Sequence, residues 1–314
     1  MQIDQQILNT QLQRFVVMVL LGFFARKIGL MNDELHDKLT TIIMRLIVPA
    51  QLVSAVARSN SGESIRLILP MTVGGLAVFC LLFAFGRLSG LALGFRGDKL
   101  RVHTGATFVG SIGFFGIPLA TSLLGGLGTA AFGLFSIVDN LYVWTIGLQM
   151  SYGVAGESGK MDLRRGLRQM MKPGTLAIFV GWGFLLLRVP ADNVLLTSLA
   201  TIGDCAGPLA MLCIGITIAR SDWRILPRSW AAVVIVALRM VAAPIIVYRV
   251  CMLLNVYQPA AVCLSLTAGM PSSSAFALMC KDHGSTAADY AAGAAILTVF
   301  ASVLTLPLVA RFMI

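Results

Sequence analysis

Long apolar runs, separated by short polar loops, dominate the sequence. A membrane-spanning α-helix rises about 1.5 Å per residue across about 30 Å of hydrocarbon, so each run of roughly 17–25 apolar residues predicts one span. The fourth and ninth runs are rich in Gly, Ser and Pro, which makes them the least regular as helices. The pattern predicts ten spans, at residues 9–29, 35–56, 66–90, 101–124, 129–153, 173–189, 194–219, 229–253, 259–280 and 286–311.

The composition also indicates that lipid is the main solvent. Hydrophobic residues make up 57% of the 314 residues and charged residues 12%, whereas soluble domains have about 45–50% and about 25%. The net charge of +10 does not indicate nucleic acid as a partner, because the Lys and Arg residues lie between apolar runs and form no continuous face. The six cysteines lie in apolar stretches without a C-x-x-C pair, so we expect no disulfide framework and no metal site.

The basic residues are distributed unevenly between the two sides of the membrane. Alternate loops carry most of them, beginning with Arg26, Lys27 and Lys38 and including the polar stretch 156–172. The positive-inside rule places these loops in the cytoplasm. With an even number of spans, both termini then lie outside. The expected location is the inner (plasma) membrane of the cell.

The chain divides into two related halves of five spans each. We assign residues 1–155 to the N-terminal half, 156–172 to a cytoplasmic linker and 173–314 to the C-terminal half. Because five is an odd number, the second half must enter the membrane from the opposite side. The expected fold class is therefore an all-α membrane protein with an inverted-topology repeat, an arrangement common in secondary transporters.

Matched prolines support the repeat. Pro49 and Pro208 interrupt the second and seventh spans, and Pro118 and Pro271, each within a G-x-P sequence, interrupt the fourth and ninth. Proline removes a backbone N–H and clashes with the preceding turn. Non-helical backbone at membrane depth is stable only where it is buried in protein or lines a wet cavity. Helices four and nine are therefore expected to be broken at a protected site near the midplane.

A broken helix offers a binding site for an anion. The N-terminus of a half-helix presents unpaired N–H groups and a partial positive charge of about +0.5. No Lys or Arg has to contact the ligand, so release remains easy. Each serine near the breaks could instead hydrogen-bond its own helix or a neighbour. The candidate substrate-binding residues are Ser111, Gly113, Gly116, Pro118, Asn140, Gly269, Pro271, Ser272, Ser273 and Ser274.

Ionisable residues within the spans are further candidates, because burying a charge in a membrane is costly. Asp139 and Asp204 could each bind a coupling proton or sodium ion. The alternative is a buried ion pair with Arg45 or Arg239. The sequence leaves both interpretations open.

The sequence around the breaks resembles the auxin efflux carrier family, which includes bacterial permeases for malonate and other organic acids. Ser111-Ile-Gly-Phe-Phe-Gly-Ile-Pro-Leu is similar to the N-x-G-F-x-G-x-P-L crossover motif of that family. The segments 268–274 and 207–210 resemble its ninth-helix and seventh-helix patterns. The resemblance implies ten helices in inverted repeats, broken helices four and nine that cross, and a transport bundle that moves like an elevator against a scaffold.

One departure from the family pattern concerns the ligand. The family often has Asn where this chain has Ser111, and Ala275 stands where a second Asn is expected. Binding would then depend on backbone N–H groups and serine hydroxyls, which suits a small carboxylate better than an auxin-like aromatic acid.

These observations predict a secondary transporter for a small carboxylate such as malonate, rather than an enzyme. We expect no cofactor apart from a coupling proton or sodium ion, and leave open whether the protein forms a homodimer. The alternative is a sodium-coupled carrier of the bile-acid-symporter type.

Overall fold

The computed structural model describes residues 5–58, 61–152, 173–220 and 230–312, and the regular secondary structure within these ranges is helical. The expected linker, 156–172, lies outside the described residues. Six helical segments in the described part are long and apolar enough to cross a membrane. They are Asp33–Ala57, Arg66–Ala92, Leu123–Ser151, Val194–Arg220, Ala232–Leu253 and Ala288–Leu306.

Most helices of the first half are interrupted, either by a π-helical segment (labelled η) or by a break. Pro49 lies at the first turn of α3, just after such a segment. The elements are α1 (Gln5–Lys27), α2 (Asp33–Ile42), η1 (Ile43–Ile47), α3 (Val48–Ala57), α4 (Ser61–Ala92), α5 (Gly97–Phe108), η2 (Ile112–Gly116), α6 (Ile117–Tyr142), η3 (Val143–Gly147) and α7 (Leu148–Ser151).

The described chain after residue 172 is also helical. The helical stretch 194–220 is interrupted at Cys205, three residues before Pro208. The elements are α9 (Pro173–Leu186), α10 (Val194–Asp204), α11 (Ala206–Arg220), α12 (Ala232–Ile235), η5 (Val236–Ala242), α13 (Ala243–Leu253), α14 (Gln258–Ala268), α15 (Ser274–Asp282) and α16 (Ala288–Phe312).

The chain is interrupted between α5 and η2 and again between α14 and α15. A glycine with positive φ ends the short helix that follows each of these two breaks. Within α6, Gly125 has φ 59° and ψ −143°, so the chain turns there and a second helix begins. Gly284, with φ +66°, lies between α15 and α16. A left-handed backbone conformation strongly favours glycine. Both breaks are thus followed by a half-helix, a glycine turn and a longer helix.

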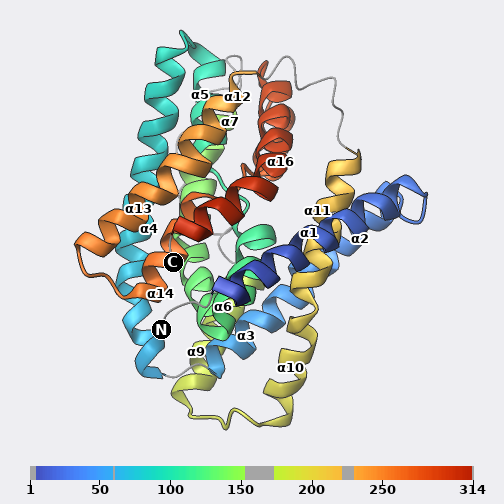
Figure 1. Ribbon diagram of the computed structural model, residues 1–314, viewed down its shortest axis with the longest axis vertical. Coiled ribbons are helices and arrows are strands. Elements are labelled where there is room, and N and C mark those ends of the chain that lie inside the picture. The colour runs from blue at the N-terminus through green and yellow to red at the C-terminus, as the bar shows by residue number, and fades with distance from the viewer. Residues whose placement is uncertain (1–4, 59–60, 153–172, 221–229, 313–314) are drawn as a thin grey trace.

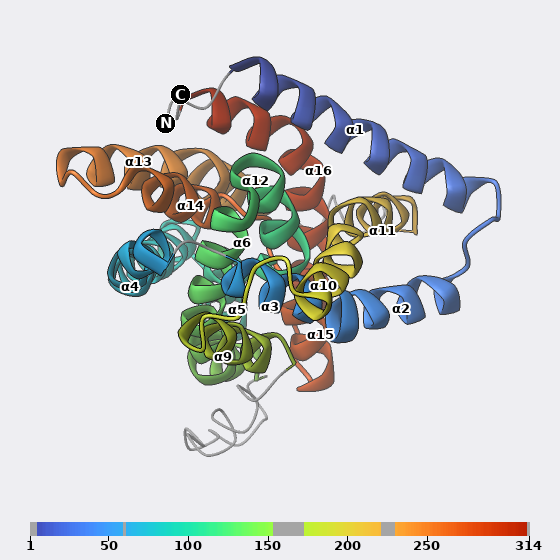
Figure 2. The same cartoon turned by 90° about the horizontal axis from the view of Figure 1, so that it is seen from below.

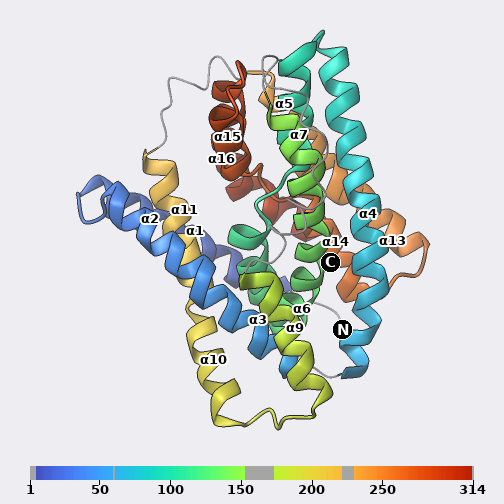
Figure 3. The same ribbon diagram turned by 180° about the vertical axis from the view of Figure 1, so that it is seen from behind.

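The helices pack in two groups. In Figures 1 and 2, α1, α2, α10 and α11 lie on one side of the molecule, and α4, α13 and α14 lie on the opposite side. α1 packs along α11, and α9 packs along α3. Figure 3 shows α9 beside α3 and α6. On the opposite side, α5 packs on α4, and α14 packs on α13.

Glycines bring the backbones of α1 and α11 into contact. A β-carbon at Gly22 would overlap the main-chain carbonyl of Leu212, and one at Gly215 would overlap that of Val19. Small residues at helix interfaces allow this close approach, which drives helix association in lipid.

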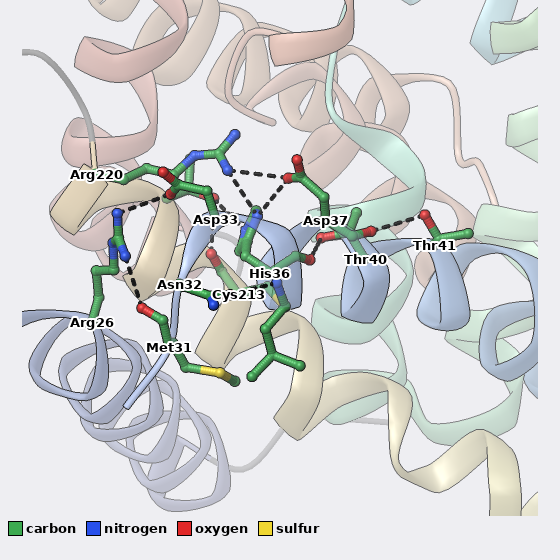
Figure 4. A network of polar contacts seen from close by, with 12 residues as sticks. Arg26, Met31, Asn32, Asp33, His36, Asp37, Thr40, Thr41, Cys213 and Arg220 are labelled. Carbon is green, nitrogen blue, oxygen red and sulfur yellow. Dashed lines mark hydrogen bonds and ion pairs between the residues drawn. The ribbon is translucent and has the colours of Figure 1, made fainter. Parts of the chain in front are cut away.

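Polar contacts join the ends of α1 and α11 to the start of α2 (Figure 4). Arg220 donates to Oδ1 of Asp37 and to Nδ1 of His36, both at 3.1 Å. Arg26, near the end of α1, pairs with Asp33 at 3.0 Å. These contacts hold three helix ends of the first group together.

A second polar cluster joins α5 to the turn before α16 and to α16 itself. Oδ2 of Asp98, in the first turn of α5, accepts hydrogen bonds from the Ser285 hydroxyl at 2.9 Å and from the amide and hydroxyl of Thr286, both at 2.8 Å. His103, which is fully buried, bonds through Nδ1 to the hydroxyl of Tyr290 at 2.6 Å. α5, which leads into one break, is therefore fixed to the chain that follows α15.

The turn at Gly125 provides a test of the half-helix architecture. Gly125→Ala should lower the free energy of unfolding by roughly 1–3 kcal/mol, because the backbone conformation there is one that L side chains rarely adopt. The space around Gly125 is open, so the effect must come from the backbone. Thermal unfolding in detergent measures it.

Gly126→Ala is the matched control, because this neighbour has no positive φ and equally open surroundings. Its helical position predicts a change of roughly 0.5–1 kcal/mol in the stabilising direction. Equal effects of the two substitutions would contradict the proposed role of the turn.

Candidate binding site at the crossing of two broken helices

Two helices stop in the interior of the protein. α5 ends at Phe108, and its C-cap residue, Val109, is extended with φ −79° and ψ 110°. α14 ends at Ala268, with Gly269 as its C-cap. Residues 106–110 and 268–272 are all buried, so these interruptions lie inside the protein.

The extended segments after α5 and α14 pair with each other as an isolated antiparallel β-bridge. The amide of Ser111 donates to the carbonyl of Pro271 at 2.9 Å, and the amide of Ser273 donates to the carbonyl of Val109 at 3.1 Å. Buried backbone groups need partners, above all where water is excluded. Each break thus supplies the hydrogen bonds that the other lacks.

The bridge places the N-termini of two half-helices next to each other. Ser111 is the N-cap of η2, which continues into α6, and Ser273 is the N-cap of α15. Both serines are half-buried, and neither side chain caps its own helix. Helix N-termini present unpaired N–H groups and positive potential. The arrangement can therefore bind an anion between two hydroxyls and two sets of amides.

Ser272 has a structural role that its sequence neighbours do not share. It is buried, and its hydroxyl donates to the carbonyl of Ala106 at 2.6 Å. Its amide donates to the hydroxyl of Thr298 on α16 at 3.0 Å. For Ser272, the alternative of a structural hydrogen bond to a neighbouring helix fits the observed contacts.

The other predicted binding residues surround the bridge or lie further along the helices. Gly113 and Gly116 belong to η2, which continues into α6, so Pro118 lies within a helix and the break expected there is at residues 109–111 instead. Ser274, the first residue of α15, is exposed. Asn140 is half-buried and donates through Nδ2 to the carbonyl of Ser136 at 2.8 Å.

The charged candidates differ in their surroundings. Asp204, at the end of α10, is exposed, as is Arg45 in η1. Asp139 on α6 is half-buried, and Arg239 in η5 is buried. The coupling-ion role and the ion pair both remain predictions for Asp139.

Comparison with known proteins identifies the family. Residues 8–310 match the family described as membrane transport protein. The chain belongs to this family. It is the auxin efflux carrier family that the crossover motifs resemble, and the chain is accordingly a multi-pass membrane protein.

Two proteins named as uncharacterized transporters show similarity to this chain. One, named as an uncharacterized transporter of Methanothermobacter thermautotrophicus, is 24% identical over 73% of this chain and 74% of its own length. The other, an uncharacterized transporter of Methanocaldococcus jannaschii, is 26% identical over 65% of this chain and 67% of its own.

In this transport protein, the structure also identifies a polar residue that the sequence reading missed. Gln51, two residues after Pro49, is buried in α3, and its Nε2 donates to Oγ1 of Thr121 at 3.2 Å. Its Oε1 has no hydrogen-bond partner within the described residues. The sequence could have indicated Gln51, because it is an amide side chain within an apolar run, two residues after a helix-breaking proline.

The buried hydroxyl of Ser272 leads to a prediction about stability. Ser272→Ala should lower the free energy of unfolding by roughly 1–3 kcal/mol, because the Ala106 carbonyl would remain buried without its donor. The exposed neighbour offers a control, since Ser274→Ala should change stability by less than about 0.5 kcal/mol. Both can be measured by thermal unfolding in detergent, and an equal loss for the two variants would argue against the assignment.

Proposed function

We propose that the protein is a secondary transporter that carries a small organic anion, a carboxylate such as malonate, across the cytoplasmic membrane by alternating access. The observation that supports this most is the β-bridge, which brings Ser111 and Ser273 together at the N-termini of η2 and α15. Membership in the membrane transport family supports the general function.

The chemistry of the site suits a small carboxylate. Half-helix N-termini that point at an anionic substrate are a recurring arrangement in secondary transporters. Hydroxyls and backbone amides can hydrogen-bond both oxygens of a carboxylate without a direct contact from Lys or Arg. Moderate affinity follows, and a carrier needs moderate affinity so that it can release its substrate.

We propose an inverted repeat of residues 1–155 and 173–314, giving ten spans in total. The reciprocal contacts support it, because α1 packs on α11 as α9 packs on α3. The order of elements supports it too, since each half contains a break, a half-helix and a glycine turn.

An elevator-like movement would then shift one helix group against the other. The polar cluster of Figure 4 lies within the group of α1, α2 and α11. The contacts of Asp98 and His103 join α5 to Ser285, in the turn before α16, and to Tyr290 on α16. A side-chain hydrogen bond from Gln51 to Thr121 joins α3 to α6. Internal contacts of this kind would let each group move as a unit.

The proposed orientation follows from charge. Arg26 and Arg220 lie at helix ends that gather in one cluster, and the positive-inside rule places such ends in the cytoplasm. Both termini would then lie outside the inner membrane.

Uptake of labelled malonate into proteoliposomes tests the function. Wild-type protein should take up malonate, and the double variant Ser111→Ala, Ser273→Ala should transport at least about tenfold more slowly at low substrate concentration. The reason is that a hydrogen bond to a charged group contributes roughly 1.5–3 kcal/mol.

Thr72→Ala is the matched control, because Thr72 is exposed on α4 and its hydroxyl bonds to the carbonyl of Ile68 in its own helix. This variant should transport like the wild type. A thermal-shift screen with short mono- and dicarboxylates would extend the test, since a bound substrate raises stability by mass action. Normal uptake by the double serine variant would refute the proposed site.

A further inference from the structure

A buried arginine occupies the crossing point of the two broken helices. Arg239 lies in the π-helical segment η5 and is only 1% exposed. Its Nε donates to the carbonyl of Met270 at 2.5 Å, and its Nη1 donates to the carbonyl of Thr107. Thr107 lies in the last turn of α5, and Met270 follows the end of α14. One guanidinium thus holds the C-terminal ends of both first half-helices.

The surrounding backbone is shaped to receive this side chain. A β-carbon at Gly110 would overlap Nη2 of Arg239, so the bridge residue must be glycine for the guanidinium to fit. π-helical segments often occur at functional positions, because the extra residue redirects a side chain.

The other carbonyls at the crossing also have internal donors. The carbonyl of Ala106 accepts from the Ser272 hydroxyl, and the carbonyls of Val109 and Pro271 accept from the amides of the bridge. The carbonyls of Met270 and Thr107 are those that Arg239 holds. The ends of the two half-helices therefore have their negative potential compensated from within the protein.

In secondary transporters, unwound carbonyls and half-helix C-termini commonly coordinate a coupling sodium ion. Here those groups are held by a guanidinium, which is always charged and presents a planar fork of donors. We propose that Arg239 is a resident cation that replaces a coupling sodium ion at the crossing, so that transport is independent of sodium. This inference rests on the proposed transport function.

Arg239 also acts on the anion site without touching the anion. Its guanidinium contacts the backbone up to Gly110, and Ser111 is the next residue along the chain. In a low-dielectric interior, the charge of the guanidinium raises the electrostatic potential at a neighbouring residue. Arg239 is thus a positioning residue, which fixes the crossing and adds positive potential beside the amides of η2.

The first test uses purified protein and needs no substrate. The melting temperature of the wild type should be the same in sodium chloride and in N-methyl-D-glucamine chloride at equal ionic strength. Arg239→Ala should melt roughly 10 °C lower, because the buried carbonyls of Met270 and Thr107 would lose their charged donor. Millimolar guanidinium or sodium should raise the melting temperature of this variant by several degrees, since either cation can bind the carbonyls that Arg239 no longer contacts. A sodium-dependent melting temperature in the wild type would overturn the proposal, and so would an Arg239→Ala variant that neither cation rescues.

A second measurement covers the case in which Arg239→Ala does not fold. Gly110→Ala should lower the melting temperature of the wild type by several degrees, because the new methyl group meets Nη2. In the Arg239→Lys background, which keeps the charge but has no Nη2, the same substitution should cost less than half as much. An equal cost in both backgrounds would overturn the assignment.

Transport separates this inference from the proposed function. Malonate uptake by the wild type should be equal with and without a sodium gradient. Uptake that a sodium gradient drives would overturn the role of Arg239 while leaving the transport function intact. If malonate is not transported at all, the proposed substrate fails, and the melting experiments still decide whether Arg239 is the resident cation.

Discussion

The need to pair backbone groups away from water determines how this protein is built. Each break in a transmembrane helix leaves N–H and C=O groups without intrahelical partners, and hydrocarbon offers none. The structure solves this by placing two breaks against each other, so that the amides of Ser111 and Ser273 bond to carbonyls of the opposite segment. Neither break could exist in a stable protein without the other.

This mutual dependence explains the polar residues around the crossing. Ser272, Thr298 and Arg239 supply donors to backbone atoms that the bridge itself does not pair. In the proposed carrier, the half-helix N-termini and the two half-buried serine hydroxyls bind the anion. Structural and ligand-binding roles would then be divided between the C-terminal and N-terminal ends of the half-helices.

Much of this architecture could be predicted from sequence, because it depends on local patterns. Apolar runs predicted the helices, and Pro271 marked one break, whereas the other break lies at residues 109–111, before Pro118 and outside its helix. The family resemblance implied that the two broken helices cross, but the residues that pair could not be predicted from local patterns, since they are about 160 residues apart in the chain. Ser272 and Ser273 are alike in sequence, but their contacts differ because successive residues of an extended segment point in opposite directions. Arg239 was conspicuous as a charge in an apolar run, whereas its carbonyl partners depend on tertiary packing.

The lengths of the short helices beside the bridge bear on how deep an anion would bind in the proposed carrier. α5 has 12 residues and α15 has 9, which correspond to about 18 Å and about 14 Å along a helix axis. Each is about half of the 30 Å hydrocarbon core. In a carrier that works as proposed, an anion at this depth has crossed about half of the membrane potential, which amounts to roughly 1 kcal/mol per charge for each 100 mV. Voltage would therefore favour loading from one face of the membrane and release to the other, and more strongly for a dicarboxylate than for a monocarboxylate.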